Sequence, residues 1–282
     1  MTKPTATQPS LATDLTGAKR MGSDEFFYDI FGINIKGLKS IWTLIRRPAE
    51  YFEAARLPDW GGNHWPSIRI WLGLTGILIA LQFLWASESS ETTALFQAMA
   101  MSIAEGLQAG AAEDGQTINL DGLDRQALGK RAFKLWIFIY PFFFIAAMCA
   151  LALIYRAWKP AVGFVVRLRY IFGIIVPGSV FGLVSALALV NVTGRLFQII
   201  SFAQLGVLLI IYGITAYRGP LYDLEKGERF GLACVSAILI LTFITIAQFI
   251  SMMISIVPTG MDIVETLKPQ IDAAKAAKDA AP

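Results

Sequence analysis

The chain has 282 residues, of which 55% are hydrophobic and only 16% are charged, and its formal net charge is +3. A soluble domain carries roughly a quarter of charged residues, so this composition argues against a water-soluble globule and favours a protein that crosses a membrane several times. The small net charge and the lack of a basic cluster interleaved with aromatic residues exclude nucleic acid as the expected partner.

The first 66 residues divide into two predicted segments. Residues 1–25 are rich in Thr, Ala, Pro, Ser and Gly, which predicts a disordered tail. Residues 26–66 are amphipathic, and one apolar helix face is formed by Leu38, Ile41, Trp42 and Ile45. Lysines and arginines lie outside that face, so we expect cytoplasmic interfacial helices on a membrane surface.

The stretch TLIRRPAEYFEAARLPDW, residues 43–60, raises the choice between a chemical site and a membrane anchor. A residue before proline is disfavoured in the helical region, and proline is well suited to the first helical position. We therefore expect one helix to break at Arg47 and another to begin at Pro48. Arginines near anionic lipid headgroups gain about 1 kcal/mol each, and tryptophans favour the headgroup region. The predicted membrane-surface anchor comprises Arg46, Arg47, Pro48, Trp60, Trp65 and Arg69.

Five apolar runs follow, each long enough for a transmembrane helix, which needs about 20 residues. The predicted spans are residues 68–86, 133–155, 170–190, 196–217 and 230–257, within a transmembrane domain at 67–258. Ionisable residues in this region fall in loops or at span edges. Ion-coupled transporters usually place such groups at membrane depth, so their absence there argues against that class.

The charges of the connecting loops predict the orientation of the spans. Eight Lys and Arg residues precede the first span, whereas the loop at 87–131 has seven acidic residues and three basic ones. The second loop has four basic residues and no acidic one, and the fourth loop also carries basic residues. This pattern places the N-terminus and the even-numbered loops in the cytoplasm and the C-terminus in the periplasm.

The remaining extramembrane parts are the 87–131 loop and the tail at 259–282. In the loop, Leu95, Met99, Ile103 and Leu107 repeat every four residues, which predicts a helix. Asp121 or Asp124 is expected to cap the helix that leads into the second span. The tail is of low complexity, and we expect a fraying helix without a site.

Small and polar residues inside the spans indicate how the helices pack. Gly178, Gly182 and Ala186 form a small-residue seam that favours close helix packing within the chain or, alternatively, in a dimer. Gln204 and Gln248 either join helices by hydrogen bonds, worth roughly 1 kcal/mol or less, or line a cavity. Residues 191–195 are short enough to predict antiparallel neighbouring spans.

Chemical motifs are scarce. His64 is the single histidine, and without a positioned partner it is interpreted as an interfacial turn residue. Cys149 and Cys234 lie in apolar runs and are interpreted as small buried hydrophobic residues. No metal-binding or nucleophile motif is present in the sequence. We therefore expect no catalytic residues, no metal and no cofactor, and predict that the protein is not an enzyme.

The segment LKSIWTLIRRPAEYFEAARLPDWGGNHWPSIRIWLGL resembles the opening segment of a bacterial family of multi-span inner-membrane proteins of unknown function. The matching positions are Arg47, Pro48, Pro66 and Arg69. The run LWIFIYPFFFIAAMCALALIYR is similar to the second span of that family, although the cysteine ribbon frequent at its start is absent here. The five-span layout is also similar to the Yip1 group, whose eukaryotic members are associated with membrane trafficking.

These patterns together predict an all-α polytopic membrane protein with five transmembrane helices and a cytoplasmic amphipathic N-terminal segment. The predicted location is the bacterial inner membrane. The predicted function is a non-enzymatic scaffold or interaction protein that organises membrane components. The alternative is an ion-uncoupled transporter or lipid-handling protein for a small or amphipathic substrate. The expected partners are the lipid bilayer, anionic lipid headgroups, and another membrane protein or a second copy of the chain.

Overall fold

The computed structural model describes residues 35–85, 91–113, 115, 117–158, 161–189, 192–221 and 224–279. The predicted disordered tail and residues 26–34 of the interfacial segment lie outside these ranges. Within them, every regular element is a helix. The α-helices are α2 (Ile35–Arg46), α3 (Pro48–Ala55), α4 (Ser67–Trp85), α5 (Glu91–Glu113), α6 (Arg125–Ile154), α7 (Phe164–Leu189), α8 (Gly194–Arg218) and α9 (Lys226–Asp279), with short 3-10 helices η2 (Trp60–Gly62) and η3 (Tyr155–Ala157).

The fold has the helices of a polytopic membrane protein. Helices α6, α7, α8 and α9 are long and apolar enough to cross a bilayer. Helix α4 is also apolar but shorter, over Ser67–Phe83. At about 1.5 Å per residue, α4 is about 28 Å long, close to the roughly 30 Å hydrocarbon core. The predicted all-α polytopic class is confirmed, and each predicted span overlaps one of the five apolar helices, although α6 and α9 extend well beyond theirs.

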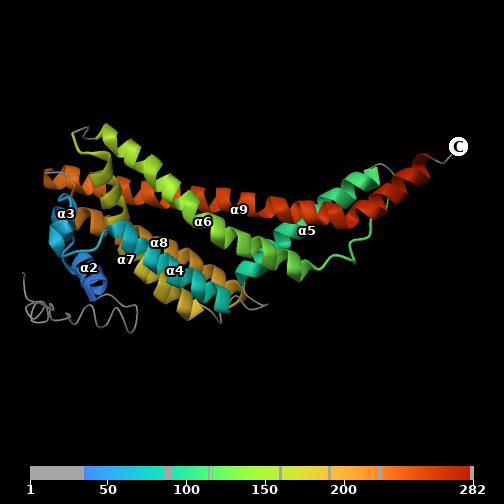
Figure 1. The fold of residues 1–282 in the computed structure, drawn as a ribbon, viewed down its shortest axis with the longest axis horizontal. Coiled ribbons are helices and arrows are strands. Elements are labelled where there is room, and N and C mark those ends of the chain that lie inside the picture. The colour runs from blue at the N-terminus through green and yellow to red at the C-terminus, as the bar shows by residue number, and fades with distance from the viewer. Residues whose placement is uncertain are drawn as a thin grey trace, which may run out of the picture.

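One group of helices, which we call the bundle, consists of α4, α7, α8 and the adjoining halves of α6 and α9 (Figure 1). Aromatic rings hold its first helix in place. The ring of Trp71 in α4 stacks on Phe144 in α6 with centroids 4.4 Å apart, and it meets Phe172 in α7 edge-on at 5.3 Å. Helices α7 and α8 are neighbours joined by the short connection that ends at Gly194, as predicted.

A second group, which we call the extension, consists of α5, the first part of α6 and the last part of α9, and projects away from the bundle (Figure 1). It has a hydrophobic cluster of its own, which includes Phe96, Phe133, Ile263 and Leu267. Helix α9 has 54 residues, or about 80 Å at about 1.5 Å per residue, so it runs through both groups.

The described part of the predicted tail, 259–279, belongs to α9, and its first turns pack against the rest of the chain. Helix α9 continues through Pro258 and Pro269 to Asp279. Tertiary contacts stabilise this part, because Ile263 and Leu267 are 0% and 1% exposed and Asp262 forms an ion pair with Arg131. Since those partners lie more than a hundred residues earlier, the tail's own composition did not reveal them.

The predicted helix in the 87–131 loop is present as α5, and Met99, Ile103 and Leu107 of the predicted repeat pack against the hydrophobic cluster of the extension. Phe96, Ala100 and Ala104 are buried, whereas Leu95 is 51% exposed. Ala residues fill this face because α5 packs closely on α6 and α9. Of the two predicted capping residues, Asp124 caps α6: its Oδ1 accepts a hydrogen bond from the N–H of Ala127 at 3.0 Å.

Candidate membrane-surface site

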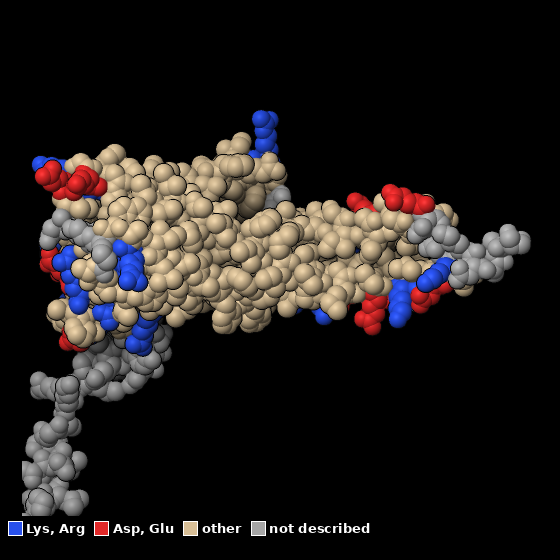
Figure 2. Space-filling view, turned by 90° about the horizontal axis from the view of Figure 1, so that it is seen from above, with Lys and Arg blue, Asp and Glu red and all other residues tan. Residues whose placement is uncertain are grey.

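On the face seen in Figure 2, most charged residues gather toward the two ends of the molecule, and the surface between them is mainly uncharged apart from a few basic side chains. One of these ends is formed by α2 and α3, the α6–α7 connection and the α8–α9 connection (Figure 1). We call it the basic end. The sequence predicted that these three parts share one side of the membrane, and the structure places them at one end of the bundle.

Arginine side chains hold the basic end together by donating to backbone carbonyl groups. Nη1 of Arg169 in α7 lies 2.9 Å from the carbonyl oxygen of Ala55 and 2.7 Å from that of Leu57. These carbonyls end α3, where a helix leaves acceptors unpaired and carries partial negative charge. Charge-assisted bonds of this kind are stronger than neutral ones, so Arg169 fixes α3 onto α7.

Two further arginines make bonds of the same type between distant segments. Nη2 of Arg56 donates to the carbonyl of Leu221 at 2.8 Å, and Nη2 of Arg218 donates to the carbonyl of Arg46 at 2.6 Å. The first bond joins the end of α3 to the α8–α9 connection, and the second joins the end of α8 to the end of α2. Helices α2 and α3 are therefore fastened to the bundle.

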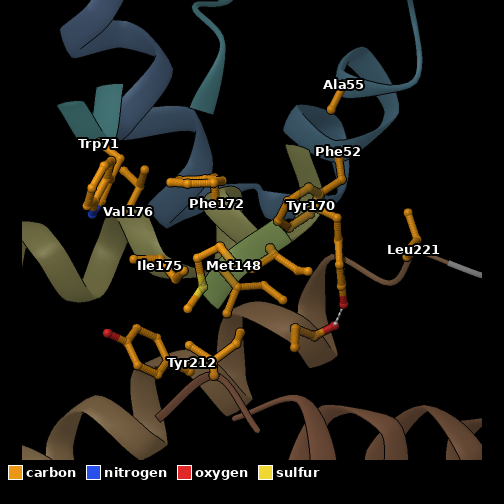
Figure 3. Packing of buried hydrophobic residues seen from close by; sticks show 14 of the residues in the cluster. Phe52, Ala55, Trp71, Met148, Tyr170, Phe172, Ile175, Val176, Tyr212 and Leu221 are labelled. Carbon is orange, nitrogen blue, oxygen red and sulfur yellow. Dashed lines mark hydrogen bonds between the residues drawn. The ribbon is translucent and has the colours of Figure 1, made fainter. Parts of the chain in front are cut away.

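Phe52 of α3 adds an apolar contact to the hydrogen bonds that hold α3 in place. Its side chain is 3% exposed, and its ring lies 4.8 Å from that of Tyr170 (Figure 3). A Cβ atom added at Gly173 or Gly219 would collide with the ring of Phe52. The two glycines thus form a notch for the phenyl ring. Sequence reasoning missed this contact, and the available signal was two glycines beside the membrane-proximal arginines Arg169 and Arg218.

The predicted break at Arg47–Pro48 is confirmed. Arg47 has φ −136° and ψ 62° as the N-cap of α3, and Pro48 occupies the first helical turn. The side chains of Arg46 and Arg47 are exposed. Arg46 lies over the ring of Trp42 at 4.4 Å, and Arg47 pairs with Glu50 at 3.6 Å, an exposed pair that adds little stability.

Helix α2 packs Gly37, Ser40 and Leu44 against the protein and leaves Leu38, Trp42 and Ile45 exposed. Gly37 packs against the ring of Trp65. Oγ of Ser40 accepts a hydrogen bond from the backbone N–H of Trp65 at 2.8 Å. By contrast, Leu38 and Trp42 are 57% and 58% exposed, and Ile45 is also exposed. Three of the four residues of the predicted apolar face are therefore exposed, as a helix lying on a membrane surface requires, whereas Ile41 packs against the bundle.

The tryptophans of the predicted anchor differ in their surroundings. Trp60 is 3% exposed, lies 5.2 Å from the ring of Tyr51 and carries the Arg169 guanidinium over its face at 5.0 Å. The α3–α4 turn folds the Trp60 side chain into the protein, so this residue of the predicted anchor has almost no exposed surface for headgroup contact. Trp65 is half-buried, and the exposed Arg69 lies over its ring at 4.3 Å.

His64 is buried beside the ring of Tyr51, with centroids 5.5 Å apart, and its Nδ1 has no hydrogen-bond partner among the described residues. Burial lowers the pKa of His64, so the ring is neutral at pH 7. Tyr51 donates its hydroxyl to the carbonyl of Trp65 at 2.7 Å, and burial raises its pKa. Among the described residues, neither group is hydrogen-bonded to a carboxylate of the kind that an acid–base arrangement uses.

The described ranges contain no group of three or more His, Cys, Asp or Glu side chains placed to hold a metal ion. The two cysteines are unpaired, with Cys149 half-buried and Cys234 exposed. The expectation that both are buried was therefore wrong for Cys234, which lies on the surface of α9 that faces a groove.

The small-residue seam of α7 forms one close contact. Gly178 packs against the ring of Tyr212 in α8 so tightly that an added Cβ would collide with it, whereas a Cβ at Gly182 would meet nothing within 4 Å. Ala186 is half-buried. Packing within the chain is thus confirmed at Gly178 and does not extend along the whole seam.

The polar pair predicted at mid-membrane does not line the groove between α8 and α9. Gln204 is half-buried and Gln248 is exposed. The groove has a volume of about 640 Å³ and lies between residues 209–218 of α8 and residues 230–238 of α9. Its wall is almost wholly apolar, so the structure does not support a cavity-lining role for either glutamine in this groove.

The geometry defines the class of the protein: an all-α polytopic membrane protein with an arginine-fastened N-terminal cap and a helical extension at the opposite end. A comparison of the chain with protein-family models, curated proteins and solved structures found no match in any of the three. The resemblance to bacterial multi-span proteins and to the Yip1 layout therefore stays a prediction.

Proposed function

We propose that the protein is a non-enzymatic scaffold of the bacterial inner membrane, with the basic end in the cytoplasm and the extension in the periplasm. The orientation rests on the Lys and Arg residues of the N-terminal segment, the α6–α7 connection and the α8–α9 connection. In this orientation, the Leu38, Trp42 and Ile45 face of α2 lies on the cytoplasmic leaflet, with Lys39 and Arg46 close to anionic headgroups.

The observation that carries the scaffold proposal is that α6 and α9 belong to both hydrophobic clusters. Phe133 and Leu267 pack in the extension, while Met148 of α6 and Ile240 of α9 pack in the bundle. Two continuous helices connect the clusters, so the extension is held at a fixed position relative to the bundle. A rigid arm of this kind suits a protein that positions a partner.

The extension also offers a surface for a partner. Val257, Met261 and Val264 follow one another at helical spacing on α9 and are 58%, 69% and 44% exposed. This strip begins at the predicted end of the fifth span, where the chain leaves the membrane. We infer that another membrane protein contacts it through an apolar face of its own.

Site-specific photo-crosslinking in cells tests this proposal. A photoreactive residue at Met261 or Val264 is expected to yield a discrete crosslinked product, because the strip contacts one partner. The matched control is Thr266, which is exposed on another face of the same helix turn. Crosslinks of equal yield at Thr266, or none at Met261 and Val264 in correctly inserted protein, would contradict the scaffold. Copurification of a soluble substrate would instead favour the transporter alternative.

A further inference from the structure

The groove between α8 and α9 has the form of a binding site for a hydrocarbon chain. Its volume of about 640 Å³ lies within the range of about 300–1,000 Å³ typical of small-molecule sites. Gly213 and Ala233 form part of the wall and leave space because their side chains are small. The rim is apolar and open to the side, since Ile210, Ile214 and Phe230 are 60%, 51% and 64% exposed.

Charged groups lie at only one end of the groove. Arg218 of α8 belongs to the lining, and Arg229 comes one residue before the lining residue Phe230 of α9. Nε of Arg229 donates to the carbonyl of Tyr217 at 2.6 Å, and its guanidinium lies 5.2 Å over the Tyr217 ring. These contacts hold Arg229 beside the groove at the basic end.

Both arginines retain donors for a ligand. A guanidinium has five N–H donors. Among the described residues, Arg218 uses one nitrogen toward the Arg46 carbonyl and Arg229 uses one toward the Tyr217 carbonyl. In the part of the chain that the structure describes, neither side chain forms an ion pair. Glu225, just before α9, and Glu228, in the first turn of α9, are exposed.

We propose that this groove binds an anionic phospholipid, with one acyl chain between α8 and α9 and the phosphate at Arg218 and Arg229. The apolar wall matches a hydrocarbon chain, and arginine forks recognise phosphate oxygens in bidentate geometry. Tyr217 stands between the chain and the phosphate, where tyrosine favours the headgroup region. The side opening lets the lipid enter from the bilayer. The proposal is independent of the scaffold, because no groove residue belongs to the extension.

The headgroup part is tested by native mass spectrometry of the purified full-length protein in detergent. Phosphatidylglycerol and phosphatidylcholine with identical acyl chains are titrated separately. Phosphatidylglycerol is expected to bind more tightly, and the double variant Arg218→Gln/Arg229→Gln is expected to weaken it about tenfold or more with little effect on phosphatidylcholine. Arg195→Gln, at the other end of α8, is the matched control and should bind like wild type.

The acyl-chain part is tested by filling the groove. Cys234→Trp places a large side chain in the lining and is expected to abolish the lipid adducts, whereas Val235→Trp, next to it but outside the lining, is expected to retain them. Thermal unfolding of each variant confirms that it is folded. Equal binding of the two lipids by wild type, or full binding by folded Cys234→Trp protein, would overturn the proposal. Absence of partner crosslinks at Met261 together with unchanged lipid binding would contradict the scaffold proposal and leave the lipid proposal intact.

Discussion

At the scale of single residues, the surroundings of a buried arginine or histidine determine its contribution to stability. Arg167 is 4% exposed, and its Nε and Nη1 have no hydrogen-bond partner among the residues that the structure describes. Arg169, two positions later, makes three bonds to carbonyl oxygens and contacts the face of Trp60. The sequence does not distinguish the two arginines. In the structure, only the guanidinium of Arg169 makes several hydrogen bonds that offset the loss of water around its charge.

Removing each of these charges should therefore have different effects on stability. Replacing buried charged groups by well-packed apolar side chains is often neutral or stabilising, and two nitrogen atoms of Arg167 lack a partner among the described residues. Arg167→Met is therefore expected to keep or raise the midpoint of thermal unfolding in detergent. Arg169→Met is expected to lower the free energy of unfolding by about 1–3 kcal/mol, because buried carbonyls lose a charged donor. Unfolding of both variants in detergent can be followed by tryptophan fluorescence. A drop for Arg167→Met as large as that for Arg169→Met would show that Arg167 has a stabilising partner.

His64 predicts a dependence of stability on pH. Its pKa is lowered in the folded protein from the ordinary value of 6.5, so the unfolded chain binds the proton more readily. The contribution of His64 is therefore fully present above about pH 6.5 and is lost as the pH falls toward the folded pKa. Thermal midpoints measured from pH 8 to pH 5 should fall less steeply for His64→Gln than for wild type. Parallel curves would show that His64 does not titrate differently on unfolding.

At the scale of elements, one helix docks onto the bundle through glycines. Helix α3 is short, with eight residues, and an isolated helix of that length is unstable in water. The insertion of Phe52 beside Gly173 and Gly219 and the bonds from Arg169 supply the tertiary contacts that hold it. The break at Arg47–Pro48 could be predicted because it depends on two adjacent residues. The notch for Phe52 could not, since its walls are contributed by α7 and the α8–α9 connection.

Two glycine substitutions in α7 distinguish this notch from ordinary helix packing. Gly173→Ala adds a Cβ that collides with Phe52 and is expected to destabilise the protein by about 1–3 kcal/mol. Gly182→Ala adds the same group where nothing lies within 4 Å, and it is expected to be neutral or slightly stabilising. Thermal unfolding compares the two. In the Phe52→Ala background the cost of Gly173→Ala should shrink; an unchanged cost would argue against the notch.

At the scale of the whole molecule, the chain is a membrane bundle with a rigid extension, and charge is concentrated at its ends (Figure 2). The apolar band between the ends agrees with the predicted spans. The distribution of Lys and Arg predicts which end faces the cytoplasm. In this predicted orientation, the basic end faces the cytoplasm and the extension faces the periplasm.

Labelling of single cysteines tests this orientation. In a variant with Cys149 and Cys234 replaced by serine, Ala109→Cys in α5 and Lys226→Cys at the start of α9 introduce exposed thiols in the extension and at the basic end. In intact cells, a membrane-impermeant maleimide is expected to label position 109 and not position 226, and permeabilisation should expose position 226. Labelling of position 226 in intact cells would reverse the orientation.

The sequence by itself determined the features that depend on local composition and spacing: the apolar helices, the Arg47–Pro48 break, the helix at α5 and the exposed apolar face of α2. Long apolar runs and proline act within a few residues, so their effects are readable along the chain. Only the tertiary structure decided that Trp60 is buried, that α9 continues to Asp279 and that Cys234 faces a groove. Each of these depends on partners far away in the sequence, because burial is a property of the assembled helices and not of any one segment.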